Sequence, residues 1–245
     1  MKLLCCVTYK GTDYQGWQKQ PDTPTIQGEI ERVLSQILNS EINIQGSGRT
    51  DAGVHAENQY FHFETEKEME LDRLRYSANC LLPKDIFIKS ISKVNDDFHA
   101  RYSAKEKIYR YKIRFGERNP LKNALETSIP YEVDRNLLEQ SLKLFEGTHK
   151  FMDFTSKEED ESEFVRTIYS VFTTYDERFK LFEVVFKGNG FMRYQIRNMV
   201  GTALAVASHK ENMDFIKYHL SEKNTREIVS YKAPAEGLYL ADVNY

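Results

Sequence analysis

The chain has 245 residues, enough to bury one large core or two modest ones, and its apolar and charged fractions, 40% and 29%, are ordinary for a globular protein. A formal charge of −3 excludes a global attraction for nucleic acid, so any RNA-binding surface has to be a local basic patch. No run approaches the ~18 apolar residues of a membrane helix. Cys5, Cys6 and Cys80 have neither metal-ligand spacing nor the even number of a disulfide framework. We therefore expect a reduced, cytoplasmic protein without membrane contact.

The first half of the chain predicts the element order β-α-β-β-α-β, which is that of a ferredoxin-like unit. Apolar residues from Ile26 to Leu38 share one helical face, and Thr25 stands where an N-cap is expected. In order, we expect a strand at 3–9, this helix, strands at 41–45 and 58–64, a helix at 71–81 that stops before Pro83, and a strand at 86–91.

The second half predicts the same order again. We expect a strand at 108–115, a helix near 137–145 capped by Asp134, strands at 165–175 and 181–187, a helix at 192–209, and a last strand at 238–243, with an additional short helix at 214–220. The fold class is therefore α+β. Two ferredoxin-like halves, 1–104 and 105–245, would join into one mixed or antiparallel sheet with helices on one side and a central catalytic cleft. An acidic run at 157–163 is placed in a solvated loop away from any RNA.

A glycine-framed carboxylate stands between two apolar runs of the first half. In the stretch 46–56, GSGRTDAGVHA, three glycines surround Asp51, and Arg49 precedes it by two residues. Glycine permits positive φ and close backbone approach, so this segment is a shaped loop that presents Asp51. Two explanations fit equally well: a tight turn in which Asp51 bonds its own backbone, or a catalytic carboxylate.

Other stretches could supply partners for Asp51. In the strand at 108–115, Tyr109 and Tyr111 lie on one face and Arg110 on the other. A buried aromatic face beneath a charged one explains most of this pattern, with one tyrosine as a possible base-stacking exception. Arg197 leaves the apolar face of its helix only partly and could reach a carboxylate. The loop at 9–20 either packs its aromatics or touches nucleic acid. The histidines, including His55 and His62, make no zinc or hydrolase constellation, and we expect them to be structural.

Taken together, these motifs resemble the tRNA pseudouridine synthase A family. The resemblance rests on GRTDAGVHA at 48–56, on YKGTDYQGWQ at 9–18 followed by TIQ at 25–27, on the 98–111 segment, on IRNMVG at 196–201 and on GLYL at 237–240, in the family's order. It spans nearly the whole chain. Ile108 stands where the family commonly has a basic residue, and Gln195 stands where we expect Met.

The resemblance implies an isomerase that converts uridines at positions 38, 39 and/or 40 of the tRNA anticodon stem-loop to pseudouridine, without a cofactor or metal. It implies that Asp51 is the catalytic nucleophile or base, Arg197 its ion-pair partner and Tyr109 the residue that stacks on the flipped-out base. Leu238 would be the apolar floor of the pocket, and Arg49 would contact the RNA. The family's members are homodimers whose tRNA crosses both subunits.

The phosphate grip is assigned to a basic segment that includes Arg110. Its cations are Lys105, Lys107, Arg110, Lys112, Arg114 and Arg118. Two other functions stay open: a non-catalytic RNA-binding module of the same fold, and a carboxylate-dependent nucleoside hydrolase that would release free base. Neither a nucleotide-phosphate loop nor a metal-ligand pattern is present in the sequence.

Overall fold

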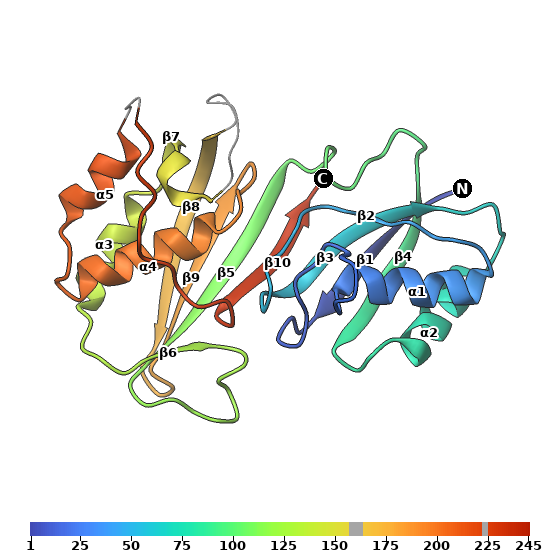
Figure 1. The fold of residues 1–245 in the computed structure, drawn as a ribbon, viewed down its shortest axis with the longest axis horizontal. Coiled ribbons are helices and arrows are strands. Elements are labelled where there is room, and N and C mark those ends of the chain that lie inside the picture. The colour runs from blue at the N-terminus through green and yellow to red at the C-terminus, as the bar shows by residue number, and fades with distance from the viewer. Residues whose placement is uncertain (157–163, 222–224) are drawn as a thin grey trace. The chain divides into compact units, whose positions relative to one another are not determined.

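The computed structural model describes residues 1–156, 164–221 and 225–245, and its contacts divide the chain into two compact units (Figure 1). Unit 1 consists of Met1–Lys105 and Tyr239–Tyr245, and unit 2 consists of Glu106–Leu238. Both combine helices with a β-sheet, so the α+β prediction is confirmed. The acidic run at 157–163 lies outside the described residues. None of the described helices is long and apolar enough to cross a membrane.

Unit 1 has the element order predicted for a ferredoxin-like unit. Its elements are β1 (Lys2–Tyr9), α1 (Ile26–Leu38), β2 (Gln45–Gly46), β3 (His55–Glu64), α2 (Leu71–Leu81), β4 (Ile86–Val94) and β10 (Leu238–Asn244). β1 pairs antiparallel with both β4 and β3, so it is the central strand of these three. β2 and β10 share the other edge of β3: β2 pairs antiparallel at Phe61 and His62, and β10 pairs parallel at His55 and Ala56.

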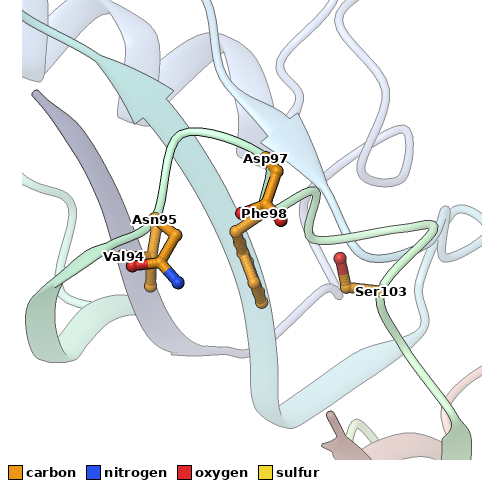
Figure 2. Close-up of a pocket in the computed structure, with 5 residues that line it drawn as sticks. All are labelled: Val94, Asn95, Asp97, Phe98 and Ser103. Carbon is orange, nitrogen blue, oxygen red and sulfur yellow. The ribbon is translucent and has the colours of Figure 1, made fainter.

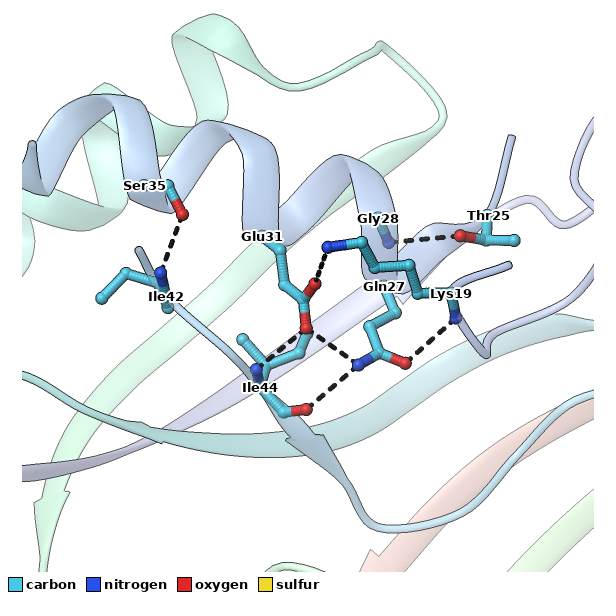
Figure 3. Close-up of polar contacts among 8 residues, drawn as sticks. All are labelled: Lys19, Thr25, Gln27, Gly28, Glu31, Ser35, Ile42 and Ile44. Atoms are coloured by element: carbon cyan, nitrogen blue, oxygen red, sulfur yellow. Dashed lines mark hydrogen bonds and ion pairs between the residues drawn. The ribbon is translucent and has the colours of Figure 1, made fainter. Parts of the chain in front are cut away.

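The strand predicted at 41–45 is wrong in extent, because only Gln45 and Gly46 pair with another strand. Ile42 and Ile44 are nevertheless buried, as the apolar pattern indicated. Side chains of α1 take the place of a partner strand (Figure 3). Ser35 Oγ accepts a hydrogen bond from the Ile42 amide at 2.9 Å, and Glu31 Oε1 accepts one from the Ile44 amide at 3.1 Å.

Unit 2 follows the predicted order with two short strands added. Its elements are β5 (Glu106–Phe115), β6 (Thr127–Ile129), α3 (Arg135–Lys143), β7 (Gly147–Lys150), the 3₁₀ helix η1 (Met152–Phe154), β8 (Val165–Asp176), β9 (Leu181–Gly188), α4 (Gln195–Ala207) and α5 (Met213–Leu220). β9 lies between β5 and β8, antiparallel to each. The caps predicted from sequence are present, since Asp134 accepts from the Leu137 amide and Thr25 of unit 1 from the Gly28 amide.

The last strand forms where it was predicted, since β10 covers Leu238–Asn244. It pairs with β3, and residues 239–245 belong to unit 1. Several contacts hold it there. The Asn58 amide donates to the Ala241 carbonyl at 2.8 Å, and the Tyr245 hydroxyl donates to the Ala100 carbonyl at 2.9 Å. The chain therefore returns to its first unit after completing the second.

Candidate active site

The Asp51 loop connects β2 to β3 at the point where β3 begins. Asp51 is half-buried, and its carbonyl accepts a hydrogen bond from the Val54 amide at 3.1 Å, which closes a turn. Gly53 in that turn has a φ of 78°, a conformation that glycine adopts without the penalty of a Cβ. Arg49, two residues earlier, is exposed. The loop thus has the shaped backbone that its glycines predicted.

The 9–20 loop supports the Asp51 loop from within unit 1. The Trp17 amide donates to the Thr50 carbonyl at 3.1 Å, and the hydroxyls of Tyr9 and Thr50 share a 2.8 Å hydrogen bond. Gly16 lies so close that a Cβ added to it would be 2.7 Å from the Thr50 carbonyl oxygen. Such an approach leaves no room for any other residue at position 16. The two loops are therefore one packed structure.

The aromatic residues of the 9–20 loop are packed inside unit 1. Trp17 is 2% exposed and its ring lies against Gly46, where a Cβ would be 2.6 Å from the indole nitrogen. Tyr14 is 6% exposed and its hydroxyl donates to Asp85 Oδ1 at 2.7 Å. Of the two explanations for these aromatics, the structure favours packing: they form the floor on which the Asp51 loop is built.

Polar side chains fix both ends of the Asp51 loop. At the N-terminal end, the Ser47 hydroxyl bonds Gln59 Oε1, and the Gln59 amide donates to the Gly48 carbonyl at 2.9 Å. At the C-terminal end, His55 Nδ1 accepts from the Gly11 amide at 3.0 Å, and its ring packs against Tyr239 with centroids 4.7 Å apart. These contacts give His55 a supporting role, in line with the structural role expected for it.

A second polar cluster aligns the segment that enters the loop (Figure 3). Glu31 of α1 is 3% exposed. Its Oε1 accepts hydrogen bonds from the side-chain Nε2 of Gln27 at 2.8 Å and from the backbone N–H of Ile44. Lys19 Nζ, 2.9 Å from Glu31, balances the buried carboxylate. A buried charge is tolerated when it is paired and hydrogen-bonded, and here it is both. α1 therefore holds the 9–20 loop and the segment that leads into β2 in one network.

In unit 2, β5 places Tyr109 and Arg110 on opposite faces. Tyr109 is buried opposite Phe186 of β9, and its ring meets Phe191 edge-on at 5.2 Å. The next core tyrosine, Tyr111, is purely structural: it bonds the Thr127 hydroxyl and the Pro234 carbonyl, and burial raises its pKa. Because side chains alternate along a strand, Arg110 does not share the face on which Tyr109 lies.

Arg197 lies in the first turn of α4 and is half-buried, as its partial departure from the apolar face predicted. Its Nε–H donates to the Ala233 carbonyl at 2.8 Å, while the Ala233 amide donates to the Arg197 carbonyl at 2.9 Å. The chain approaches closely here, because a Cβ on Gly201 would lie 2.8 Å from backbone atoms of 231–233. The guanidinium is therefore held by backbone on a rigid helix.

The remaining predicted residues are Leu238 and the basic segment that includes Arg110. Leu238, at the start of β10, is 5% exposed, as an apolar pocket floor would be. The basic segment is less free than the sequence suggested: Arg114 pairs with Glu126, and Lys112 lies 4.0 Å from Glu183. Sequence reasoning missed Tyr194, which has a φ of 63° and immediately precedes α4. A backbone conformation of this kind leaves no signal in the sequence unless glycine occupies the position.

Comparison with known proteins identifies the family. A family model described as tRNA pseudouridine synthase matches residues 5–103 and 142–245. A relative from Geobacillus sp. (strain WCH70), named tRNA pseudouridine synthase A, is 41% identical over 247 residues, which cover 100% of this chain and 98% of that protein. A relative of the same name from Streptococcus gordonii is 37% identical, covering 98% of this chain and 96% of that protein. The chain belongs to the tRNA pseudouridine synthase A family.

Membership in the tRNA pseudouridine synthase A family makes the protein an isomerase of tRNA uridines. Both Asp51 and Arg197 lie inside the segments that the family model matches, whereas Tyr109 and Arg110 lie between them. A solved structure titled as an H/ACA RNP bound to a substrate RNA containing 2′-deoxyuridine has a weak likeness, with 14% identity and a TM-score of 0.35 over 83% of this chain and 52% of that one.

Unit 1 of this synthase also contains an open cavity of about 340 Å³ (Figure 2). It is lined by Val94, Asn95, Asp97, Phe98 and Ser103. The loop that forms it rests on His62, because the Ala100 amide donates to His62 Nδ1 at 3.1 Å and the ring of His99 lies 4.7 Å from that of His62. Burial, together with the charges of His99 and Lys2, lowers the pKa of His62 to about 4, against the smaller opposing influence of Glu64.

His62 should make the protein less stable in acid. It stays neutral when folded, while the unfolded chain takes up the proton below about pH 6.5. The contribution of neutral His62 to the free energy of unfolding is therefore complete above that pH. It is lost as the pH falls towards 4, by up to about 3 kcal/mol. Urea unfolding at pH 7.5 and pH 5 measures this loss. His62→Asn keeps an acceptor for the Ala100 amide and should flatten the pH dependence, whereas the exposed control His209→Asn should not. Equal pH dependence in all three proteins would remove His62 as the cause.

Proposed function

We propose that this protein converts uridines at positions 38, 39 and/or 40 of the tRNA anticodon stem-loop to pseudouridine. Asp51 acts as nucleophile or base, Arg197 is its ion-pair partner and Tyr109 stacks on the target base. Arg49 and Arg110 contact the RNA, and Leu238 forms the apolar floor. The observation that carries the proposal is the half-buried carboxylate of Asp51 on a loop that packs closely against the 9–20 loop, in a chain of this family.

The reaction requires little more than a positioned carboxylate and a cation. The bond from ribose C1′ to uracil N1 breaks, the ring turns, and C1′ joins C5; the proton lost from C5 balances the one gained at N1. A carboxylate can serve as the nucleophile or base in this sequence. Burial favours the protonated acid, and a neighbouring guanidinium opposes this because it grips the ionised form through two parallel bonds. Arg197 is suited to that task because backbone contacts already fix it.

The target base has to leave its stack, which costs a few kcal/mol. Stacking on one aromatic ring returns roughly 1–3 kcal/mol, so further contacts have to supply the rest. Tyr109 is the proposed ring. Arg49 is exposed on the Asp51 loop, which supports its proposed contact with RNA near the reacting nucleotide. Arg110, on the other face of β5 from Tyr109, is assigned to a more distant part of the RNA. We also propose a homodimer, with one tRNA contacting both subunits.

Carbodiimide-stop mapping of tRNA tests the proposal. Unmodified tRNA is incubated with the wild-type protein and with Asp51→Ala, and reverse transcription reports each pseudouridine as a stop. We expect stops at positions 38–40 with the wild-type protein only. A non-catalytic RNA-binding protein would yield no stops with either, and a nucleoside hydrolase would release free uracil, which chromatography of the same reactions detects. Either result would reject the isomerase.

Tyr109 can be tested by comparing two substitutions. Tyr109→Phe keeps a stacking ring and should react at near wild-type rate, whereas Tyr109→Ala should lose about 5- to 160-fold, the rate equivalent of about 1–3 kcal/mol of stacking. The measurement is single-turnover pseudouridine formation with saturating enzyme. Tyr111→Ala, at the neighbouring core tyrosine, serves as a control for damage to packing and is followed by its unfolding midpoint. Wild-type rates for both Tyr109 variants would exclude the stacking role.

A further inference from the structure

Three cations surround one tyrosine ring at the start of α4. The Tyr194 ring centroid lies 4.5 Å from Lys232 Nζ, 4.8 Å from the Arg193 guanidinium carbon and 5.5 Å from that of Arg197. Arg193 also donates a hydrogen bond to the Tyr194 hydroxyl at 2.9 Å. Arg193 and Lys232 are exposed. We call Arg193, Tyr194 and Lys232 the Tyr194 cluster.

The backbone holds the Tyr194 cluster in place. The paired hydrogen bonds between Arg197 and Ala233, and the close approach at Gly201, seat the 231–233 segment directly on α4 and so position Lys232. On the other side, the Thr155 hydroxyl donates to the Arg193 carbonyl at 2.9 Å. Tyr194 itself has a φ of 63°, which is uncommon for any residue other than glycine. Strained conformations of this kind concentrate at ligand-binding sites.

The Tyr194 cluster carries two exposed positive charges. In the part of the chain that the structure describes, neither Arg193 nor Lys232 forms an ion pair with a carboxylate, unlike Arg114 and Arg135 of the same unit. The start of α4 adds partial positive charge, and Tyr194 offers no side-chain cap to it. The two exposed cations and the partial positive charge of the helix start both favour an anion.

We propose that the Tyr194 cluster is a phosphate subsite that holds one backbone phosphodiester of the RNA beside Arg197. This inference rests on the proposed function, which makes RNA the anionic ligand. A phosphodiester carries one negative charge and several acceptor oxygens, which match two flexible cations and a helix N-terminus. Arg193 and Lys232 act as positioning residues. By fixing the RNA backbone next to Arg197, they determine where the flipped-out nucleotide enters the site.

The test measures how tRNA binding depends on salt. Arg193→Gln and Lys232→Gln each remove one cation. Matched controls are Arg178→Gln and Lys210→Gln, because those cations also lie over aromatic rings, each at 5.1 Å. We expect each test variant to lower the slope of log Kd against log salt by about 0.7–0.9, the value for one lost phosphate contact, and the controls to leave it unchanged. KM for tRNA should rise at least fivefold in the test variants, with a smaller change in kcat.

A further variant separates binding from folding. Tyr194→Gly removes the ring that gathers the cations but suits a φ of 63°, so its unfolding midpoint should not fall while its salt slope does. Unchanged salt slopes in both Arg193→Gln and Lys232→Gln would overturn the subsite. An equal decrease of the salt slope in the two control variants would also overturn it. An active wild-type enzyme with unchanged slopes would reject the subsite alone. An inactive wild-type protein with reduced slopes would reject the synthase and leave an RNA-phosphate site.

Discussion

Replacing Asp51 by Asn should abolish pseudouridine formation while leaving tRNA binding close to wild type. The amide is nearly the same size as the carboxylate but cannot act as nucleophile or base, so we expect the single-turnover rate to fall by at least about 10⁴-fold, as when the central group of a catalytic set is removed. Filter binding at fixed salt provides the affinity, and carbodiimide-stop mapping provides the rate.

The loop itself should tolerate this substitution. Its turn is closed by backbone groups, from the Val54 amide to the Asp51 carbonyl, and it is supported by Thr50 and Trp17 rather than by the Asp51 side chain alone. The unfolding midpoint should therefore change little. Substantial residual modification by Asp51→Asn would reject Asp51 as the reacting group, and a large loss of tRNA binding would point instead to a structural role.

The second large effect is expected for Arg197→Met. Methionine retains much of the length and apolar stem of arginine but removes the cation that we propose keeps the Asp51 carboxylate ionised. We expect the rate to fall by about 10²- to 10³-fold, the usual loss when one stabilising donor is removed from a catalytic site. The acid limb of the pH–rate profile should also move to higher pH, because a carboxyl group without its cation is more easily protonated. That shift would distinguish a role in the reaction from a role in packing.

Two controls bear on Arg197. Arg197→Lys keeps a positive charge but loses the planar guanidinium and its hydrogen bond from Nε to the Ala233 carbonyl. Its single-turnover rate should therefore lie between those of Arg197→Met and the wild-type protein. In the double variant Asp51→Asn/Arg197→Met, the rate should be no lower than in Asp51→Asn alone if the two residues work as one pair. Multiplicative losses, or an unshifted pH profile in Arg197→Met, would exclude the pairing.

Much of the fold could be predicted from hydrophobic periodicity and caps. α1, α2 and the strands β1, β8 and β9 lie close to their predicted ranges because each has an apolar face that only one period explains. The strand at 41–45 could not be predicted correctly, since its apolar alternation is real but its backbone partners are the side chains of Ser35 and Glu31. The local pattern of apolar residues predicts which side chains are buried. Strand pairing also depends on residues elsewhere in the chain.

The candidate site was predictable to a similar degree. The glycines around Asp51 predicted a shaped loop, and the resemblance proposes its partners, which stay a prediction. What the sequence alone left open was the role of the aromatics at 9–20, because burial under another loop depends on tertiary contacts such as those of Gly16 and Trp17. The left-handed conformation of Tyr194 was equally invisible, because a tyrosine gives no indication that its backbone is strained.

The return of β10 to β3 also affects the order in which the protein can fold during synthesis. Residues 239–245 pair beside His55, the first residue after the Asp51 loop segment, yet the ribosome makes them only after all 133 residues of Glu106–Leu238. Domains usually fold as they emerge, N-terminal first. Here β10, which pairs with the start of β3, is synthesised last. Unit 1 therefore cannot complete its sheet until unit 2 has been translated, and the start of β3 lacks its β10 partner until then.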